Sequence, residues 1–305
     1  AWLRLWKKRG QTWEAETIWH PTFGGRHDRL RDVEEADIDG DGRGDLVVAT
    51  HDQGVVAVVW RGPSGWRTEE IGRSADTFVH EIEVGDLDGD GKPEIYATPS
   101  RPNTESGAGQ GGSVTRYEWD GRRFEKSVVE EWSSRHAKEI LVTDLEGDSR
   151  QELYVVLEAE VGGGGTIVSP VGIIRVDWEG GKFVTTKVTE LNDRFCRSLL
   201  AGDPDGDGVQ ELVAAAFTSG VWIIERNGAA YTPHCIDPTS GGFEHAACLA
   251  DMDDDGRQEL YVADDRKGVI RRYDYRGGTY VATVIHRRDV PGQAMVWNIT
   301  VADLE

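Results

Sequence analysis

Short apolar runs of strand length, separated by polar turns, fill this chain of 305 residues. The runs at residues 46–49, 153–156 and 260–263 contain β-branched and aromatic side chains. Gly, Asn and Asp recur in the segments between such runs. A sustained apolar period of 3.6 residues, the mark of an amphipathic helix, is missing at helical length. The pattern therefore predicts an all-β protein.

A nine-residue acidic segment recurs along the chain at intervals of 48 to 59 residues. An apolar run precedes each copy and another follows it. Two extended runs then join through a tight glycine turn, as at residues 119–124, 178–183 and 275–280. We expect each repeat to form four antiparallel strands, A to D, with the acidic segment between strands A and B, which is typical of a β-propeller. The copies lie at residues 37–45, 86–94, 144–152, 203–211 and 251–259, with a partial copy at 303–305.

The two ends of the chain carry the pattern of one further blade. Residues 2–20 resemble strands C and D of the repeat, and residues 297–303 resemble strand A. Joined, they would close a six-bladed propeller of four-stranded antiparallel blades, with residues 1–305 as a single domain. Strand B of that blade is missing from the sequence, which leaves open whether the chain is a piece of a longer protein.

The acidic segments have the composition of cation-binding loops, with carboxylates at positions 1, 3, 5 and 9 and Gly or a polar residue at positions 4 and 6. Carboxylates this close repel one another unless a cation neutralises them, and Ca²⁺ takes six to eight oxygen ligands. We predict about five structural Ca²⁺ sites that stabilise the connections between strands A and B. The alternative is an acidic turn without metal. The predicted ligands are Asp37, Asp39, Asp41, Asp45, Asp86, Asp88, Asp90, Glu94, Asp144, Glu146, Asp148, Glu152, Asp203, Asp205, Asp207, Glu211, Asp251, Asp253, Asp255 and Glu259.

At these loops the sequence resembles the FG-GAP/VCBS-type repeat family, which includes the propeller of the integrin α-subunit. The shared feature is Asp-x-Asp-Gly-Asp-Gly-x-x-Asp/Glu, and the resemblance covers nearly the whole chain. It implies a propeller with calcium in the A–B loops. The family's Phe-Gly…Gly-Ala-Pro segment is absent, and Glu146, Ser149 and Asp254 replace the usual loop residues, so we expect weaker binding at the third site. The family spans adhesion modules, lectins and carbohydrate-active enzymes, so the resemblance does not fix the activity.

Long connections lie on the rim opposite the acidic loops. They comprise residues 98–114 and 157–171 between strands B and C, and residues 21–32, 237–246 and 287–297 between strands D and A. Six of the eight histidines fall in or beside these connections. Because long loops on a rigid scaffold commonly carry binding residues, we predict the functional site on this rim.

A largely basic set of residues stands six positions before the first acid of each loop, including the partial copy, where it would ring the mouth of the central channel. The set consists of Arg31, His80, Lys138, Arg197, His245 and Trp297. In a structural interpretation, this set pairs with the following residues Asp32, Glu81 and Glu139. Alternatively, it lines a pocket for an anionic or polyhydroxylated ligand, in which histidines act as acid/base groups or bind an additional divalent metal. The candidate catalytic residues are Arg31, His80, His136, Lys138, Arg197 and His245, and the candidate substrate-binding residues are His27, His51, Arg101 and Trp297.

Composition narrows the range of partners. The chain has 34 Lys+Arg against 55 Asp+Glu, and the net charge of −21 argues against binding to nucleic acid or to anionic membranes. No apolar run is long enough to span a bilayer. The three scattered cysteines fit neither a disulfide framework nor a zinc site.

Two functions remain in competition. The first is a carbohydrate-active enzyme of lyase, dehydratase or isomerase type, by analogy with propellers that carry similar repeats. The second is a non-catalytic module that binds a glycan, another small polar ligand or a protein partner. The position of the histidines favours the enzyme, and the missing blade strand favours the module. Open calcium loops suit millimolar calcium, so we expect an extracellular or periplasmic location.

Overall fold

The computed structural model describes residues 1–25, 28–51, 53–101, 111–243, 245–289 and 296–302. These residues form antiparallel strands and one 3-10 turn, η1 (Gly163–Gly165), which confirms the all-β prediction. No helix within the described ranges is long and apolar enough to cross a membrane. Contacts divide the chain into two compact units, Ala1–Val142 and Thr143–Glu305. The single domain over residues 1–305 stays a prediction.

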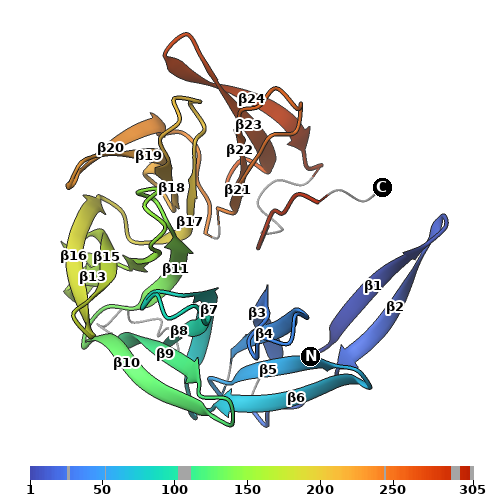
Figure 1. Cartoon of the computed structure of the whole chain (residues 1–305). Helices are drawn as coiled ribbons and strands as arrows, with labels where there is room; N and C mark the ends of the chain where they lie inside the picture. Colours follow the sequence, from blue (N-terminus) through green and yellow to red (C-terminus); the bar gives the residue numbers. More distant parts are fainter. Residues whose placement is uncertain (26–27, 52, 102–110, 244, 290–295, 303–305) are drawn as a thin grey trace. The chain divides into compact units, whose positions relative to one another are not determined.

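The first unit holds one hairpin and two complete sheets, drawn in blue to green in Figure 1. The hairpin pairs β1 (Leu3–Arg9) with β2 (Thr12–Trp19). The sheets have the orders β3-β4-β5-β6 and β7-β8-β9-β10. Their strands are β3 (Arg29–Ala36), β4 (Asp45–His51), β5 (Val56–Gly62), β6 (Gly65–Gly72), β7 (Phe78–Gly85), β8 (Glu94–Ser100), β9 (Gly112–Trp119) and β10 (Phe124–Trp132).

The division between the units falls at the end of β11 (Ala137–Thr143), and the remaining sheets have the orders β11-β12-β15-β16, β17-β18-β19-β20 and β21-β22-β23-β24. The long connection after β12, expected to be a loop, contains the short hairpin β13-β14. The strands are β12 (Glu152–Leu157), β13 (Glu160–Val161), β14 (Ile167–Ser169), β15 (Val171–Glu179), β16 (Lys182–Leu191), β17 (Cys196–Gly202), β18 (Glu211–Ala216), β19 (Gly220–Asn227), β20 (Ala230–Asp237), β21 (Ala247–Ala250), β22 (Glu259–Asp264), β23 (Val269–Arg276) and β24 (Thr279–Arg287).

Each four-stranded sheet follows the predicted order, with an acidic loop between its first and second strands. The predicted glycine turns close the hairpins of the third and fourth strands. Aromatic residues face each other across these turns, as Trp119 and Phe124 do with ring centroids 4.9 Å apart. Such cross-strand pairs fix the register of the outer hairpin.

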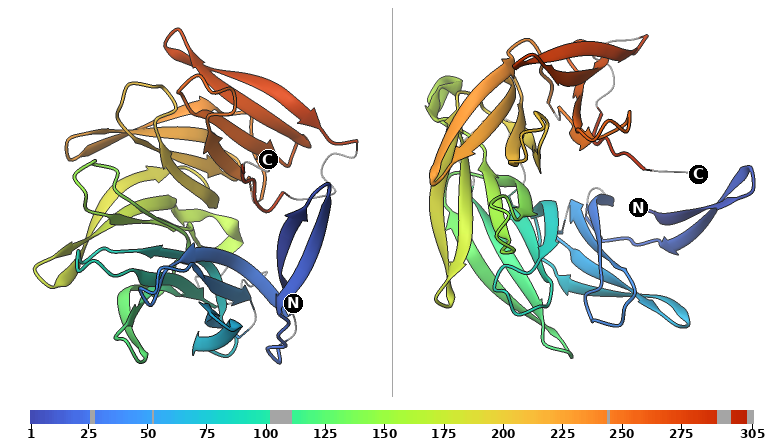
Figure 2. Two further views of the ribbon diagram at one scale, coloured as in Figure 1. Left: turned by 45° about the vertical axis from the view of Figure 1, so that its right-hand side comes forward. Right: turned by 45° about the horizontal axis from the view of Figure 1, so that its top comes forward.

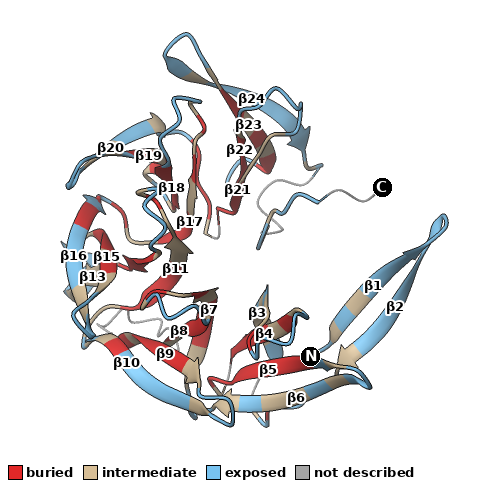
Figure 3. Cartoon of the chain, viewed as in Figure 1, coloured by how far each residue is buried: buried red, intermediate tan, exposed pale blue. Residues whose placement is uncertain are grey.

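Apolar side chains between adjacent sheets form the core of each unit. In the first unit, Val58 of β5 belongs to the same buried cluster as Ile82 of β7. In the second unit, Ile223 of β19 belongs to the same buried cluster as Leu260 of β22. Burying one such side chain contributes about 1.5–3 kcal/mol. Figure 3 shows that burial is concentrated in the second and third strands of the sheets and falls toward the fourth strand.

The hairpin β1–β2 projects from the rest of the first unit in both views of Figure 2. At its base, Trp19 meets Phe23 edge to face at 5.6 Å. Trp2 at the base, and Trp6 and Trp13 further out, are about half exposed. The hairpin agrees with the two strands predicted within residues 2–20.

The strand predicted at residues 297–303 is not found, since residues 296–302 have no regular secondary structure. A strand forms where a neighbour pairs with its backbone N–H and C=O groups, and none of the described strands pairs with this segment. The partial acidic segment at 303–305 lies outside the described residues. The closure of a sixth blade, and thus the count of six, stays a prediction.

Candidate functional site

All five acidic segments fold into the same turn. In the first loop, Asp37 accepts the backbone N–H groups of Asp41 on Oδ1 (2.9 Å) and of Gly42 on Oδ2 (2.8 Å). The first acid of every other loop accepts the same two bonds. The turn needs left-handed backbone at positions 4 and 6, and there Ser149 (φ 70°) and Asp254 (φ 56°) replace glycine. These two departures from the repeat therefore stand at strained positions.

The turn brings most of the predicted metal ligands together, with the oxygens of each group within 4.8 Å of one another. Three predicted ligands, Asp45, Glu146 and Asp207, stand outside the groups. Asp45 and Asp207 accept backbone N–H bonds, and Glu146 pairs with Arg175 at 2.7 Å. Donor sets made wholly of carboxylate oxygens fit a hard cation such as Ca²⁺. The groups are Asp37, Asp39 and Asp41; Asp86, Asp88, Asp90 and Glu94; Asp144, Asp148 and Glu152; Asp203, Asp205 and Glu211; and Asp251, Asp253, Asp255 and Glu259.

The acid at position 9 of these loops is buried beneath the turn. Burial raises the pKa of Glu152 to about 7. Burial, together with the charges of Asp205, Asp207 and Asp203, raises the pKa of Glu211 to about 8. The fold therefore holds carboxyl groups that resist ionisation, which a bound cation would reverse.

Histidines on the opposite rim of the first unit are packed inside the protein. The rings of His51 and His80 lie 4.7 Å apart, and His51 stacks on Phe78 at 4.6 Å. His51, His80 and His136 are each less than 10% exposed. The structure thus brings two predicted site residues, His51 and His80, into direct contact.

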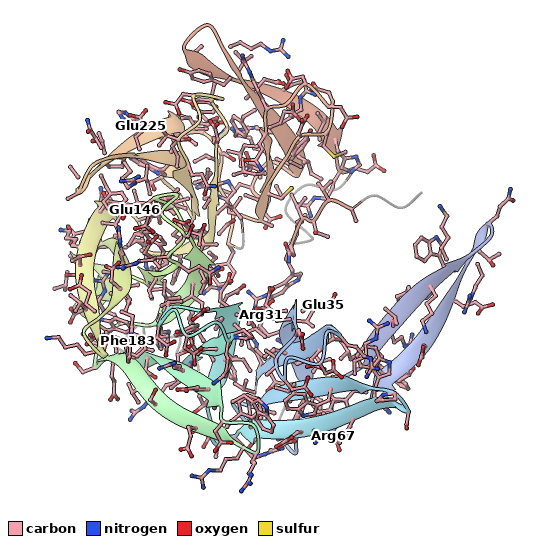
Figure 4. The ribbon with its side chains drawn as sticks, viewed as in Figure 1. Arg31, Glu35, Arg67, Glu146, Phe183 and Glu225 are labelled. Carbon is pink, nitrogen blue, oxygen red and sulfur yellow. The ribbon has the colours of Figure 1, made fainter. Side chains whose placement is uncertain are left out.

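The basic residues at the start of the inner strands of the first unit also face inward. Lys138 is fully buried, and its Nζ donates to Ser100 Oγ at 3.3 Å. Burial raises the pKa of both Asp32 and Glu81. The positive charge of Arg31 has a smaller effect that lowers the pKa of both carboxyl groups. This interaction is the one that the structural interpretation of the set predicts. Figure 4 labels Arg31 on β3.

The sequence analysis named Asp32 and Glu81 only as partners of the basic set, and it missed Glu34 and Glu83 beside them on β3 and β7. Burial raises the pKa of Glu34 to about 7, with a further rise from Asp32, and it raises the pKa of Glu81 and Glu83 as well. Asp32 Oδ2 accepts the backbone N–H of Ile82 at 2.9 Å, which ties the two strands together. The sequence could have indicated these carboxyl groups, because the acids on each strand are two residues apart and side chains with that spacing point to the same face of a sheet.

On the same rim of the second unit, Arg197 forms a buried ion pair with Glu158, with Nη2 to Oε1 at 2.9 Å. The guanidinium also lies over the ring of Phe243 at 4.1 Å and near that of Phe195 at 5.3 Å. Phe217 completes an edge-to-face cluster, in which the three ring centroids are 5.6 to 6.0 Å apart. All three rings are half-buried, so the cluster is open to solvent in part.

Topology explains why these rings meet. Phe195 precedes β17, Phe217 follows β18, and Phe243 lies between β20 and β21. In antiparallel sheets these connections fall at the end opposite the acidic loops. The sequence analysis missed the three phenylalanines because each is isolated in sequence, although all lie in or beside connections of the predicted functional rim.

His245 is buried, with both ring nitrogens engaged. Nδ1 lies 2.6 Å from the Ala216 carbonyl oxygen and Nε2 lies 2.8 Å from Ser240 Oγ. Because a carbonyl oxygen accepts only, Nδ1 carries the proton and Nε2 accepts from the hydroxyl. Burial lowers the pKa of His245, so the ring is neutral. This arrangement suits a structural histidine better than a metal ligand.

The remaining predicted site residues are less informative. Arg101 and Trp297 are exposed, Trp297 by 51%. His27 lies outside the described residues. Of the six residues predicted to ring the channel, three belong to the first unit and three to the second.

Comparison with known proteins identifies the repeat and the fold. Residues 37–97 match the FG-GAP-like repeat, which confirms the resemblance on that segment. No curated protein matches the chain. A lectin from Agrocybe aegerita that recognises non-reducing terminal N-acetylglucosamine shares 15% identity and a TM-score of 0.57, over 92% of this chain and 73% of the lectin. The periplasmic gluconolactonase of Pseudomonas aeruginosa shares 14% identity and a TM-score of 0.52, over 82% and 68% of the two chains. The likeness is one of fold, and the four-stranded antiparallel sheets are consistent with a β-propeller.

Proposed function

We propose that this chain, which carries an FG-GAP-like repeat, is a carbohydrate-binding β-propeller. The observation that carries the proposal is the half-exposed cluster of Phe195, Phe217 and Phe243 around the Arg197–Glu158 pair. Aromatic rings pack against the apolar faces of sugars, and the buried ion pair holds the guanidinium of Arg197 against the ring of Phe243, so the cluster offers a fixed stacking surface of the kind found in sugar sites. The sugar-related names of the lectin and the lactonase support this ligand class.

In this proposal the acidic loops bind Ca²⁺ and stabilise the scaffold. Their grouped carboxylate oxygens are the ligands that calcium prefers. Open loops of this kind are suited to millimolar calcium, which favours an extracellular or periplasmic location. The cation would have no part in the phenylalanine cluster, because the acidic loops lie at the other end of the sheets.

A glycan array, followed by titration of the best ligand, tests the proposal. Substituting Phe243→Ala removes one ring of the cluster and should weaken binding about tenfold or more, the loss of roughly 1.4 kcal/mol. The matched control is Phe183→Ala, which removes a ring that faces Trp178 on the outer hairpin. Equal loss in both variants, or an array without any bound glycan, would count against the proposal.

A second candidate is a carbohydrate-active enzyme of the lyase, dehydratase or isomerase type. The buried carboxyl groups of the first unit favour it, because a pKa near 7, as at Glu34, suits a general acid or base. His51 and His80, whose rings contact each other, add groups that can transfer protons. Incubation with acidic and neutral oligosaccharides should then give product that Glu34→Gln abolishes. Binding without turnover would assign the chain to the non-catalytic class.

A further inference from the structure

The five acidic loops differ in how the protein neutralises them. In the second, third and fifth loops, an arginine from the third strand of the same sheet contacts loop carboxylates. Among the described residues, no third-strand arginine pairs with the carboxylates of the first or the fourth loop. The contacts are Arg116 to Glu94 at 2.7 Å and to Asp88, Arg175 to Glu146 at 2.7 Å and to Glu152 at 3.5 Å, and Arg272 to Asp253 at 3.6 Å.

These arginines occupy one position in the sheet register. Each stands opposite the third residue of the second strand of its sheet, which is a tyrosine in all three sheets. In the sheets of the first and fourth loops, both positions are aliphatic. The three polar pairs are Tyr96–Arg116, Tyr154–Arg175 and Tyr261–Arg272, and the two aliphatic pairs are Val47–Val58 and Val213–Ile223.

The fourth loop has a second peculiarity. Glu211, its acid at position 9, is 4% exposed, and Oε2 has no hydrogen-bond partner among the described residues. In the other four loops, the backbone N–H of the second loop residue donates to this acid at 3.1 to 3.3 Å. In the fourth loop that residue is Pro204, which has no N–H. A buried carboxylate without a donor is destabilising unless something else supplies the partner.

Two arginines of the described chain lie near the fourth loop without forming an ion pair with its acids. Arg226, from the same sheet, pairs with Glu146 at 3.5 Å. Arg257 lies against the backbone at Gly206. Within the described part of the chain, no ion pair joins a basic residue to the four acids at residues 203–211.

Space is also available beside the loops that lack arginine. A hollow of about 290 Å³ next to Asp205 is lined by Ile223, Glu225 and Tyr275, among others, and Figure 4 labels Glu225. A second hollow, of about 380 Å³, adjoins Asp39 and Asp41 of the first loop. Such openings admit the water molecules that complete the coordination shell of Ca²⁺.

We propose that the fourth loop is the strongest divalent-cation site of this chain, where the cation replaces the arginine of the second, third and fifth loops. The inference rests on the proposal that the acidic loops bind Ca²⁺. Glu211 Oε2 gains in the cation the partner that Pro204 does not provide, and Asp203 and Asp205 supply further oxygens. Where a guanidinium already holds the loop carboxylates, a cation has fewer free oxygens to bind.

Calcium titration of the chelator-treated full chain, followed by calorimetry, tests the ranking. Glu211→Gln should weaken the tightest binding step about tenfold or more. The matched control Glu94→Gln, at the same position of the second loop, should leave that step unchanged. The converse pattern, with the tightest step lost in Glu94→Gln and kept in Glu211→Gln, would overturn the proposal.

A third variant and a second readout separate the cation from simple misfolding. Ile223→Arg places an arginine at the register position used by the other loops, so it should weaken the tightest step and raise the melting temperature in EDTA. Glu211→Gln should melt in EDTA no lower than the parent chain, because Oε2 of the carboxylate that it removes has no donor among the described residues. A lower melting temperature for both variants would assign a purely structural role and refute the proposal. A parent chain that binds no calcium at all would instead refute calcium binding by the loops.

Discussion

Arg197 donates to Glu158 across 2.9 Å, and both side chains are buried. A buried ion pair adds little net stability, because the desolvation of both charges offsets their attraction. Its effect is instead geometric, since it holds the guanidinium 4.1 Å from the ring of Phe243. The pair thus orients the centre of the proposed sugar site.

Removing one partner of this pair should be costly. Glu158→Ala leaves a buried guanidinium without its carboxylate, and we expect a loss of about 3–5 kcal/mol in the free energy of unfolding. The double variant Glu158→Gln with Arg197→Met removes both charges and should recover most of that loss. Urea denaturation measures the difference. If Glu158→Ala unfolds at the same urea concentration as the parent chain, the ion pair does not contribute to stability in the way expected.

Removal of calcium should lower the thermal stability. One site held at 100 times its dissociation constant contributes about 2.7 kcal/mol, so the loss of a single site should lower the melting temperature of a chain of 305 residues by about 4 °C. The change is followed by circular dichroism before and after EDTA, with calcium-saturated EDTA as the control. Identical melting curves would remove calcium from the proposed function.

The repeat made most of the strands predictable. Each acidic loop marks the passage from a first to a second strand, and aromatic residues flanking a glycine turn, such as Trp119 and Phe124, mark the outer hairpin. Because these signals are local in sequence, they predict the strands without any knowledge of how the sheets pack. The strand expected at residues 297–303 failed because pairing requires a neighbour, which local pattern does not reveal.

The contacts of the candidate sites were less predictable, because they arise between segments far apart in sequence. The register correctly picked Lys138 and Arg197 as equivalent positions, yet one is bound to the Ser100 hydroxyl and the other to Glu158. The meeting of Phe195 and Phe243 depends on how two sheets pack. Sequence spacing carries no information on either contact.

Gly220 is required by the turn that precedes β19. Its φ is +101°, and a Cβ there would lie 2.1 Å from the Asp237 carbonyl oxygen. Gly220→Ala must displace the backbone of β20, so we expect a loss of about 3 kcal/mol or more in unfolding free energy. Gly228→Ala is the matched control, since its φ of +62° is also left-handed but its surroundings are open, and it should lose about 1 kcal/mol. Equal losses would contradict the close approach seen at Gly220.

The half-buried carboxyl of Glu34 should make the stability of the protein depend on pH. Its pKa rises from an ordinary value of 4.5 to about 7 in the folded chain, chiefly through burial and further through Asp32. Between these values the folded state holds a proton that the unfolded state has lost, so stability falls as the pH rises. The contribution is fully present below pH 4.5 and lost as the pH passes through 7.

Comparison with Glu34→Gln isolates this effect. The amide does not titrate, so the parent chain should lose about 1 kcal/mol relative to the variant between pH 5 and pH 8, a figure reduced from the full shift because solvent reaches part of the side chain. Melting in excess calcium keeps the acidic loops from contributing. Glu35→Gln, on the exposed side of the same strand, is the control and should follow the parent chain at every pH. If Glu34→Gln also runs parallel to the parent across this range, Glu34 ionises normally and the acid/base role drawn from it falls.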